Sequence, residues 1–91
     1  MIFEWDEYKR WRNIKIRRLD FNIAEFVLSD PNVVIMVDNR KDYGEIRFLA
    51  FGKVGNLCLC LCYTMRGEKY RVITLFQVNK KEWSKHYGKN S

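Results

Sequence analysis

The sequence LCLCLCYTM, residues 57–65, alternates leucine with cysteine and lies between two turn signals. Gly55-Asn56 precedes it and Arg66-Gly67-Glu68 follows it, and both contain residues typical of hairpin turns. Because successive side chains of a strand point to opposite faces, the alternation predicts a long strand with its three cysteines on one face. The alternating segments Glu45–Lys53 and Lys69–Gln77 are predicted to be its antiparallel neighbours.

Val33–Val37 is a continuous apolar, largely β-branched run, which predicts a fourth strand covered on both faces. The polar segment Asn39–Gly44 is predicted to be a loop, and Ile2–Trp5 could add a short strand. Capping residues predict three helices. These are a first helix from an Asp6 N-cap to about Arg17, a second from Asp20 or Asn22 through Ser29, and a last over Lys80–Tyr87 behind Asn79 and Glu82.

The predicted fold class is therefore α+β, with two N-terminal helices, a four-stranded antiparallel sheet and a C-terminal helix. The short segment at Ile2–Trp5 would be an additional strand. The length of 91 residues fits one domain, and residues 88–91 are expected to be a flexible polar tail. The aromatic residues of the first helix do not form one apolar stripe along it.

The composition argues against several classes of protein. No apolar stretch is long enough to span a membrane, and the N-terminus is acidic where a signal peptide would be basic, so a cytoplasmic protein is expected. The odd number of cysteines, Cys58, Cys60 and Cys62, is typical of reduced thiols in a core. A metal site would need a fourth ligand, and the only histidine, His86, lies far along the chain. We therefore expect neither a metal nor a cofactor.

The chain has 17 Lys and Arg against 11 Asp and Glu, a formal charge of +6. The basic residues gather near both ends, on the predicted first and last helices. They are Lys9, Arg10, Arg12, Lys15, Arg17 and Arg18 in the first cluster, and Lys80, Lys81, Lys85 and Lys89 in the second. Such clusters are typical of a chain that binds phosphates, or of solvated helix faces that only maintain solubility.

Several positions are specific candidates for phosphate contact. Lys9, Asn13 and Arg17 are spaced four residues apart and would form one polar stripe on a helix. Arg47 and Arg71 interrupt apolar strands, where a guanidinium needs a carboxylate or a phosphate partner. Glu45 and Glu68 could be those carboxylates, and each arginine would then form an ion pair with a purely structural role.

No hydrolase motif is present: there is no catalytic Ser-His-Asp order, no glycine-rich phosphate loop and no metal-ligand spacing. One compatible reaction is RNA cleavage in which the 2′-hydroxyl of the substrate is the nucleophile, because arginine and lysine can neutralise the developing charge. Tyr63 could stack on a base or be a buried core residue. His86, four residues after Glu82, could transfer a proton or be an ordinary surface histidine.

The order of these segments resembles the BrnT-type toxins of bacterial type II toxin–antitoxin systems. The resemblance extends from Phe3 to about Tyr87. It is carried by Phe3-Glu4-Trp5-Asp6-Glu7 with Lys9 and Asn13, by Phe21 and Ala24, by Asp38-x-Arg40, Gly44-Glu45-x-Arg47 and Gly52, and by Tyr63-Thr64-x-Arg66-Gly67, Arg71-x-Ile73 and Glu82.

The resemblance implies a RelE-like fold and a metal-independent endoribonuclease that cleaves RNA and inhibits translation. It also implies neutralisation by a BrnA-like ribbon-helix-helix antitoxin, with operator DNA bound mainly through the antitoxin. On this hypothesis the candidate residues fall into two groups. Lys9, Arg17, Arg47 and Arg71 would be catalytic, and Asn13, Tyr63, Arg66, Lys80 and Lys81 would bind RNA.

The chain departs from the family pattern at three positions. Ile16 and Arg17 stand where the family usually has a Lys-His pair, and Phe76 stands where it usually has an arginine. Arg17 retains a positive charge but cannot exchange a proton near neutral pH. The alternative function is therefore a catalytically degenerate BrnT-like protein, encoded by a phage or mobile element, that binds nucleic acid or a protein partner without cleavage.

Overall fold

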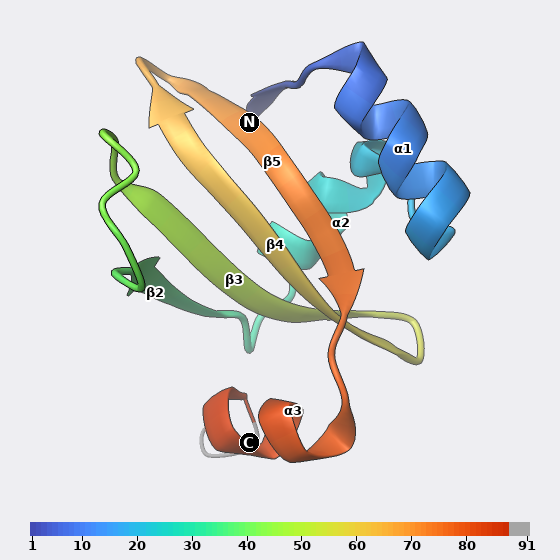
Figure 1. The fold of residues 1–91 in the computed structure, drawn as a ribbon. Coiled ribbons are helices and arrows are strands. Elements are labelled where there is room, and N and C mark those ends of the chain that lie inside the picture. Colours follow the sequence, from blue (N-terminus) through green and yellow to red (C-terminus); the bar gives the residue numbers. More distant parts are fainter. Residues whose placement is uncertain (88–91) are drawn as a thin grey trace.

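A computed structural model describes residues 1–87, and the predicted tail at 88–91 lies outside the described residues. The α+β fold class is confirmed, with three α-helices and a five-stranded sheet within this part of the chain (Figure 1). The elements in chain order are β1 (Ile2–Glu4), α1 (Glu7–Arg17), the 3₁₀ helix η1 (Phe21–Ile23), α2 (Ala24–Leu28), β2 (Val34–Asp38), β3 (Arg47–Val54), β4 (Leu57–Arg66), β5 (Lys69–Gln77) and α3 (Lys80–His86).

The strand order in the sheet is β1-β5-β4-β3-β2. Strands β2 to β5 form the predicted antiparallel meander, and β4, the cysteine strand, is the middle strand of the five-stranded sheet. The prediction of an antiparallel sheet was wrong in one respect, because β1 belongs to the sheet and pairs with β5 in parallel. The sheet is therefore mixed. Strand β1 can lie parallel to β5 because most of the chain, including both N-terminal helices, separates the two strands.

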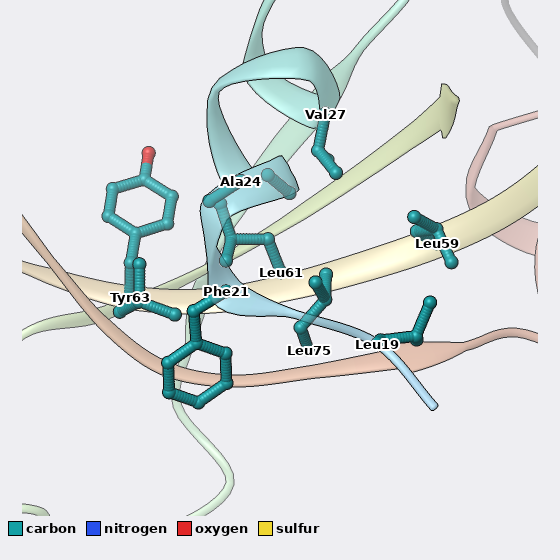
Figure 2. Packing of buried hydrophobic residues seen from close by; sticks show 10 residues of the cluster. Leu19, Phe21, Ala24, Val27, Leu59, Leu61, Tyr63 and Leu75 are labelled. Carbon is teal, nitrogen blue, oxygen red and sulfur yellow. The ribbon is translucent and has the colours of Figure 1, made fainter. Parts of the chain in front are cut away.

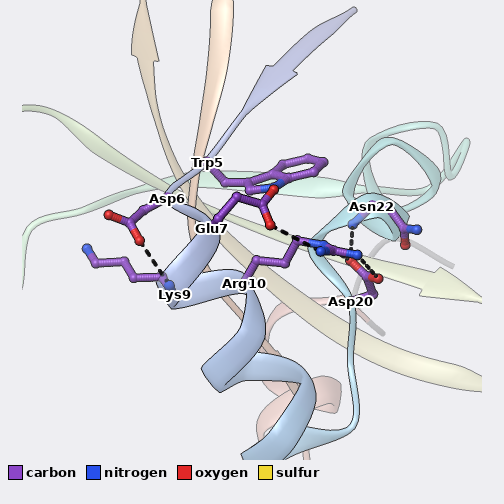
Figure 3. Close-up of polar contacts among 7 residues, drawn as sticks. All are labelled: Trp5, Asp6, Glu7, Lys9, Arg10, Asp20 and Asn22. Carbon is purple, nitrogen blue, oxygen red and sulfur yellow. Dashed lines mark hydrogen bonds and ion pairs between the residues drawn. The ribbon is translucent and has the colours of Figure 1, made fainter.

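The predicted helix starts are confirmed by their capping bonds. The Asp6 carboxylate accepts a hydrogen bond from the Lys9 amide at 3.1 Å, and the Asp20 carboxylate accepts one from the Asn22 amide at 3.0 Å (Figure 3). The segment behind Asp20 begins as the 3₁₀ turn η1 before it becomes α2. Arg10 of α1 binds both oxygens of Asp20 at 2.8 and 2.9 Å, and this ion pair holds the pKa of the Asp20 carboxyl below its ordinary value.

The main core lies between the sheet and the segment of η1 and α2. Phe21, Ala24 and Val27 pack against Leu61 and Leu75, with other buried residues of β4 and β5 around them (Figure 2). Helix α2 approaches β3 closely at Gly52, where an added Cβ would lie 2.5 Å from the carbonyl oxygen of Val27. Glycine is therefore required at this contact for steric reasons.

A second cluster lies on the opposite face of the sheet, where Phe51 and Cys60 pack against Val78, Tyr87 and other residues near α3. Cys60 and Cys62 are buried, Cys58 is partly buried, and all three thiols are free, as the odd number of cysteines indicated. Burial raises the pKa of the Cys60 thiol to about 12. No helix within residues 1–87 is long and apolar enough to cross a membrane.

Strand β2 is an edge strand, and the prediction that both its faces are covered was wrong. Ile35 is 47% exposed and Val37 is 55% exposed, whereas Val34 and Met36 pack against the second cluster. A continuous apolar run has the same sequence pattern whether one or both faces are buried, so the pattern could not distinguish the two cases.

Candidate nucleic-acid interface

Asn13 joins α1 to β5. Its side chain is buried, and its Nδ2 atom donates hydrogen bonds to the carbonyl oxygens of Leu19 and Leu75, both at 2.9 Å. Its Oδ1 atom accepts from the Thr74 hydroxyl at 3.3 Å and from the Leu75 amide at 3.4 Å. The amide group is therefore fully occupied inside the protein. It positions the side chains on either side of it along the helix.

A pocket of about 240 Å³ lies between α1 and β5 beside Asn13. We call it the α1–β5 pocket. The predicted polar stripe is realised here, because Lys9, Asn13 and Arg17 all contribute to the lining. The full lining is Lys9, Arg12, Asn13, Ile16, Arg17, Ile73 and Thr74. The pocket thus combines three cations with no acidic residue.

The three cations of the α1–β5 pocket have no competing carboxylate. None of the ion pairs within the described residues involves Lys9, Arg12 or Arg17. Arg10, on the inner side of the same helix, is by contrast held by Asp20 and Glu7. An anion entering the pocket therefore meets positive charge without displacing a carboxylate, which favours phosphate binding.

A row of polar side chains crosses the neighbouring face of the sheet. Glu4, Arg71, Thr64, Arg47 and Asp38 are direct cross-strand partners, one from each strand. Because paired residues of adjacent strands point to the same face, we call this set the polar row. The row places the two predicted strand arginines on one face with only the central strand between them.

Both arginines of the polar row are bound to glutamates. Arg47 pairs with Glu45 at 3.3 Å, as predicted, and its guanidinium lies 4.0 Å from the ring centroid of Tyr43. Arg71 pairs through Nη1 with Glu4 at 2.8 Å, and this replaces the predicted partner Glu68. Each arginine uses one nitrogen for its carboxylate, so further N–H donors of each fork are left for a phosphate.

The two faces of the candidate site meet on β5. Thr74 lines the α1–β5 pocket. It is also the cross-strand partner of Cys62, and Cys62 points to the same face as Thr64, so Thr74 lies on the face of the polar row. Phe76 lies two residues further along this face. The α1–β5 pocket therefore opens at the border of the face that carries the arginines.

Two of the departures from the family pattern are in contact. The guanidinium carbon of Arg17 lies 5.3 Å from the ring centroid of Phe76, a cation–π contact between the end of α1 and β5. A guanidinium is thus present beside the strand position where the family pattern has an arginine, although it comes from the helix. Ile16, the third departure, is 66% exposed at the rim of the pocket.

A second cavity, of about 420 Å³, lies on the same face of the sheet between β2 and α3, and Phe76 forms part of its wall. His86 also lines this cavity. Its Nε2 lies 3.0 Å from an oxygen of Glu82, and its ring stacks on Phe51 at a centroid distance of 4.5 Å. The histidine is therefore an oriented, partly buried group with the glutamate partner that its spacing predicted.

The remaining predicted RNA contacts are placed apart from these groups. Tyr63 is 5% exposed and packs in the main core between Phe48 and Tyr70, so its ring has no free face for a base. Arg66 is exposed at one end of the β4–β5 hairpin. Lys80 and Lys81 are exposed at the start of α3, beyond the other end of β5, about 30 Å away along a nine-residue strand.

Some residues of the interface were not singled out from the sequence. Arg12 belonged to a general basic cluster, although its spacing from Lys9 and Ile16 places these three residues on one side of a helix. Thr74 and Glu4 carry no local signal, because their roles depend on contacts with distant parts of the chain.

Comparison with known proteins identifies a family. Residues 5–82, most of the chain, match the family model described as the ribonuclease toxin, BrnT, of type II toxin–antitoxin systems. A comparison with curated proteins gives no match. The chain therefore belongs to the BrnT family of ribonuclease toxins of type II toxin–antitoxin systems.

Proposed function

We propose that this protein is an endoribonuclease that cleaves RNA without a metal ion and thereby inhibits translation. The observation that supports it best is the α1–β5 pocket, in which Lys9, Arg12 and Arg17 gather without a carboxylate partner. Membership of a family of ribonuclease toxins gives the substrate class. The cations of the pocket and the remaining N–H donors of Arg47 and Arg71 together suit the charge of a phosphodiester.

In the proposed reaction the 2′-hydroxyl oxygen attacks the adjacent phosphorus. A bond forms between O2′ and phosphorus, the bond from phosphorus to O5′ breaks, and the products are a 2′,3′-cyclic phosphate and a 5′-hydroxyl. The 2′-hydroxyl loses a proton and O5′ gains one. Lys9 and Arg17 neutralise charge on the non-bridging oxygens, and Arg47 and Arg71 orient the strand with their remaining N–H donors.

The α1–β5 pocket lacks the side chains that most often transfer protons in enzymes. Its lining contains no histidine or carboxylate. His86 with Glu82 is a candidate, because the cavity that it lines shares Phe76 with the contact made by Arg17. We assign His86 this role as part of the proposal.

The same observation favours the alternative function. A pocket that concentrates cations but holds no histidine or carboxylate suits a protein that binds RNA without cleaving it. A diverged copy encoded by a phage or mobile element would fit this description. The two functions share the binding surface and differ in the chemical step, so one assay separates them.

The assay is incubation of the purified protein with single-stranded RNA in EDTA, followed by analysis of the product ends. The proposal predicts 2′,3′-cyclic phosphate and 5′-hydroxyl ends, with cleavage reduced about 100-fold or more in Arg17→Ala and in Arg71→Ala. Lys53→Ala, which removes an exposed cation outside the pocket, is the matched control and should leave the rate unchanged. Binding of RNA by the wild type without any cleavage at high protein concentration would establish the alternative.

The proposal includes a partner and a place of action. We propose that a BrnA-like ribbon-helix-helix antitoxin neutralises the protein in the cytoplasm, and that operator DNA is contacted mainly by the antitoxin. A neighbouring gene that encodes such a protein, and relief of growth arrest on co-expression, are the expected results. Growth arrest that persists with the neighbouring product present would contradict this part.

A further inference from the structure

Helix α1 exposes two large aromatic side chains to solvent. Tyr8 is 66% exposed and Trp11 is 53% exposed, and their ring centroids lie 6.4 Å apart with planes inclined by 30°. The inner side of the helix is occupied by Arg10 and Asn13, which bind Asp20 and β5. The scattered aromatic residues of this segment are therefore explained by an aromatic outer face rather than by a buried stripe.

Two cations lie beside these rings. The guanidinium carbon of Arg12 is 5.9 Å from the ring centroid of Tyr8, and Nζ of Lys15 is 4.7 Å from that of Trp11. Neither cation belongs to an ion pair of the described residues. We call Tyr8, Trp11, Arg12 and Lys15 the outer face of α1. It combines exposed rings with positive charge and contains no carboxylate.

This outer face is continuous with the candidate site, because Arg12 belongs to both: it packs near Tyr8 and lines the α1–β5 pocket. We propose that the outer face of α1 is a platform for single-stranded RNA, on which two bases stack while Arg12 and Lys15 meet the adjoining phosphates. This platform rests on the proposed function, because it specifies where an RNA strand held in the pocket would continue along the protein surface.

The chemistry favours a single strand over a duplex. Unpaired bases can stack on an aromatic side chain whatever their identity, whereas the bases of a duplex are already stacked on one another. The cation–π contacts made by Arg12 and Lys15 are weak at exposed sites, so entering bases and phosphates can replace them. The exposed ring of Phe26 on α2 provides a contrast, because it lies beside Glu25 and carries no adjacent cation in the sequence.

The test is binding of a labelled 10-nucleotide 2′-O-methyl RNA, which lacks the nucleophilic hydroxyl, to the wild type and to three variants. The double variant Tyr8→Ala/Trp11→Ala removes both rings, and Tyr8→Phe/Trp11→Phe keeps two aromatic rings at these positions. Phe26→Ala removes a ring of comparable exposure on α2 and is the matched control. Urea unfolding of each variant checks that the fold is unchanged.

We expect Tyr8→Ala/Trp11→Ala to weaken single-strand binding about tenfold or more, with a smaller effect on a duplex of the same length. Tyr8→Phe/Trp11→Phe should retain most of the affinity, and Phe26→Ala should equal the wild type. Unchanged single-strand affinity in the alanine double variant would overturn the platform and leave this face for a protein partner. The platform would also be overturned if the alanine double variant lost as much affinity for the duplex, or if Phe26→Ala lost as much single-strand affinity.

This outcome is separable from that of the proposed function. Because the probe cannot be cleaved by 2′-hydroxyl attack, the binding assay reports the platform even if the wild type proves to have no nuclease activity. Conversely, an active nuclease whose affinity is unaffected by Tyr8→Ala/Trp11→Ala would retain the proposed function and exclude the platform.

Discussion

Replacing Asn13 with alanine should destabilise the fold rather than simply remove an RNA contact. The side chain is buried and joins α1 to β5 through hydrogen bonds to Leu19, Thr74 and Leu75. In Asn13→Ala the backbone groups of Leu75 and the carbonyl of Leu19 lose this buried side-chain partner. The physical consequence is a loss of stability that does not depend on RNA.

The magnitude follows from these bonds. The two bonds at 2.9 Å contribute about 1 kcal/mol each, and an unsatisfied buried amide adds at least about 1 kcal/mol, so Asn13→Ala should lose about 3 kcal/mol. A chain of 91 residues has a total stability of about 5–14 kcal/mol. The variant should therefore melt about 12–24 °C lower than the wild type.

Thermal and urea unfolding, followed by circular dichroism, measure this loss, and the urea midpoint should fall by about 1–3 M. Asn22→Ala, an exposed asparagine of η1, is the matched control and should change stability by less than about 0.5 kcal/mol. An Asn13→Ala variant that unfolds like the wild type but binds RNA more weakly would contradict this structural role, and would show that the Asn13 amide contacts RNA.

Three further predictions concern the rest of the fold. Gly52→Ala places a Cβ 2.5 Å from the Val27 carbonyl oxygen and should lower the stability by about 1–3 kcal/mol. A urea midpoint equal to that of the wild type would contradict this clash. Asp38→Asn should cost about 2 kcal/mol at pH 7, because hydrogen bonding from Arg40 lowers the pKa of the Asp38 carboxyl in the folded state. The stabilisation from the ionised Asp38 is present above the unfolded-state pKa of about 3.9 and is lost as the pH falls below that value. Asp38→Asn should therefore lose less stability than the wild type between pH 5 and 2. Parallel stability profiles of the two proteins over this pH range would exclude this role of Asp38. The Cys60 thiol, fully buried and with its pKa raised to about 12, should resist alkylation at pH 8 until the protein is unfolded in urea, and rapid native labelling at this position, located by mass spectrometry, would contradict its burial.

The strands and turns could be predicted because their signals are local. The alternation in residues 57–65, the turn glycines around it and the cap at Asn79 each depend on neighbouring residues, and all three predictions are confirmed. The parallel pairing of β1 could not be predicted in the same way. A three-residue strand has too few positions for a pattern, and its partner β5 lies at the other end of the chain.

The same distinction applies to the candidate site. The helical spacing of Lys9, Asn13 and Arg17 predicted a shared surface, and the α1–β5 pocket confirms that these residues lie together. The spacing could not show that Asn13 turns inward, because its partners on β5 are about 60 residues away in sequence. For the same reason the partner of Arg71 was misassigned: Glu4 is separated from it by 67 positions.

The most direct test of the account is RNA cleavage in EDTA by the wild type and by Arg17→Ala, with folding verified by urea unfolding. The central claim is that the cations of the α1–β5 pocket neutralise the reacting phosphate. It predicts cleavage by the wild type, products with 2′,3′-cyclic phosphate ends, and a rate about 100-fold lower in the folded Arg17→Ala variant. Wild-type cleavage that is unchanged in Arg17→Ala, or no cleavage of bound RNA by the wild type, would contradict the claim.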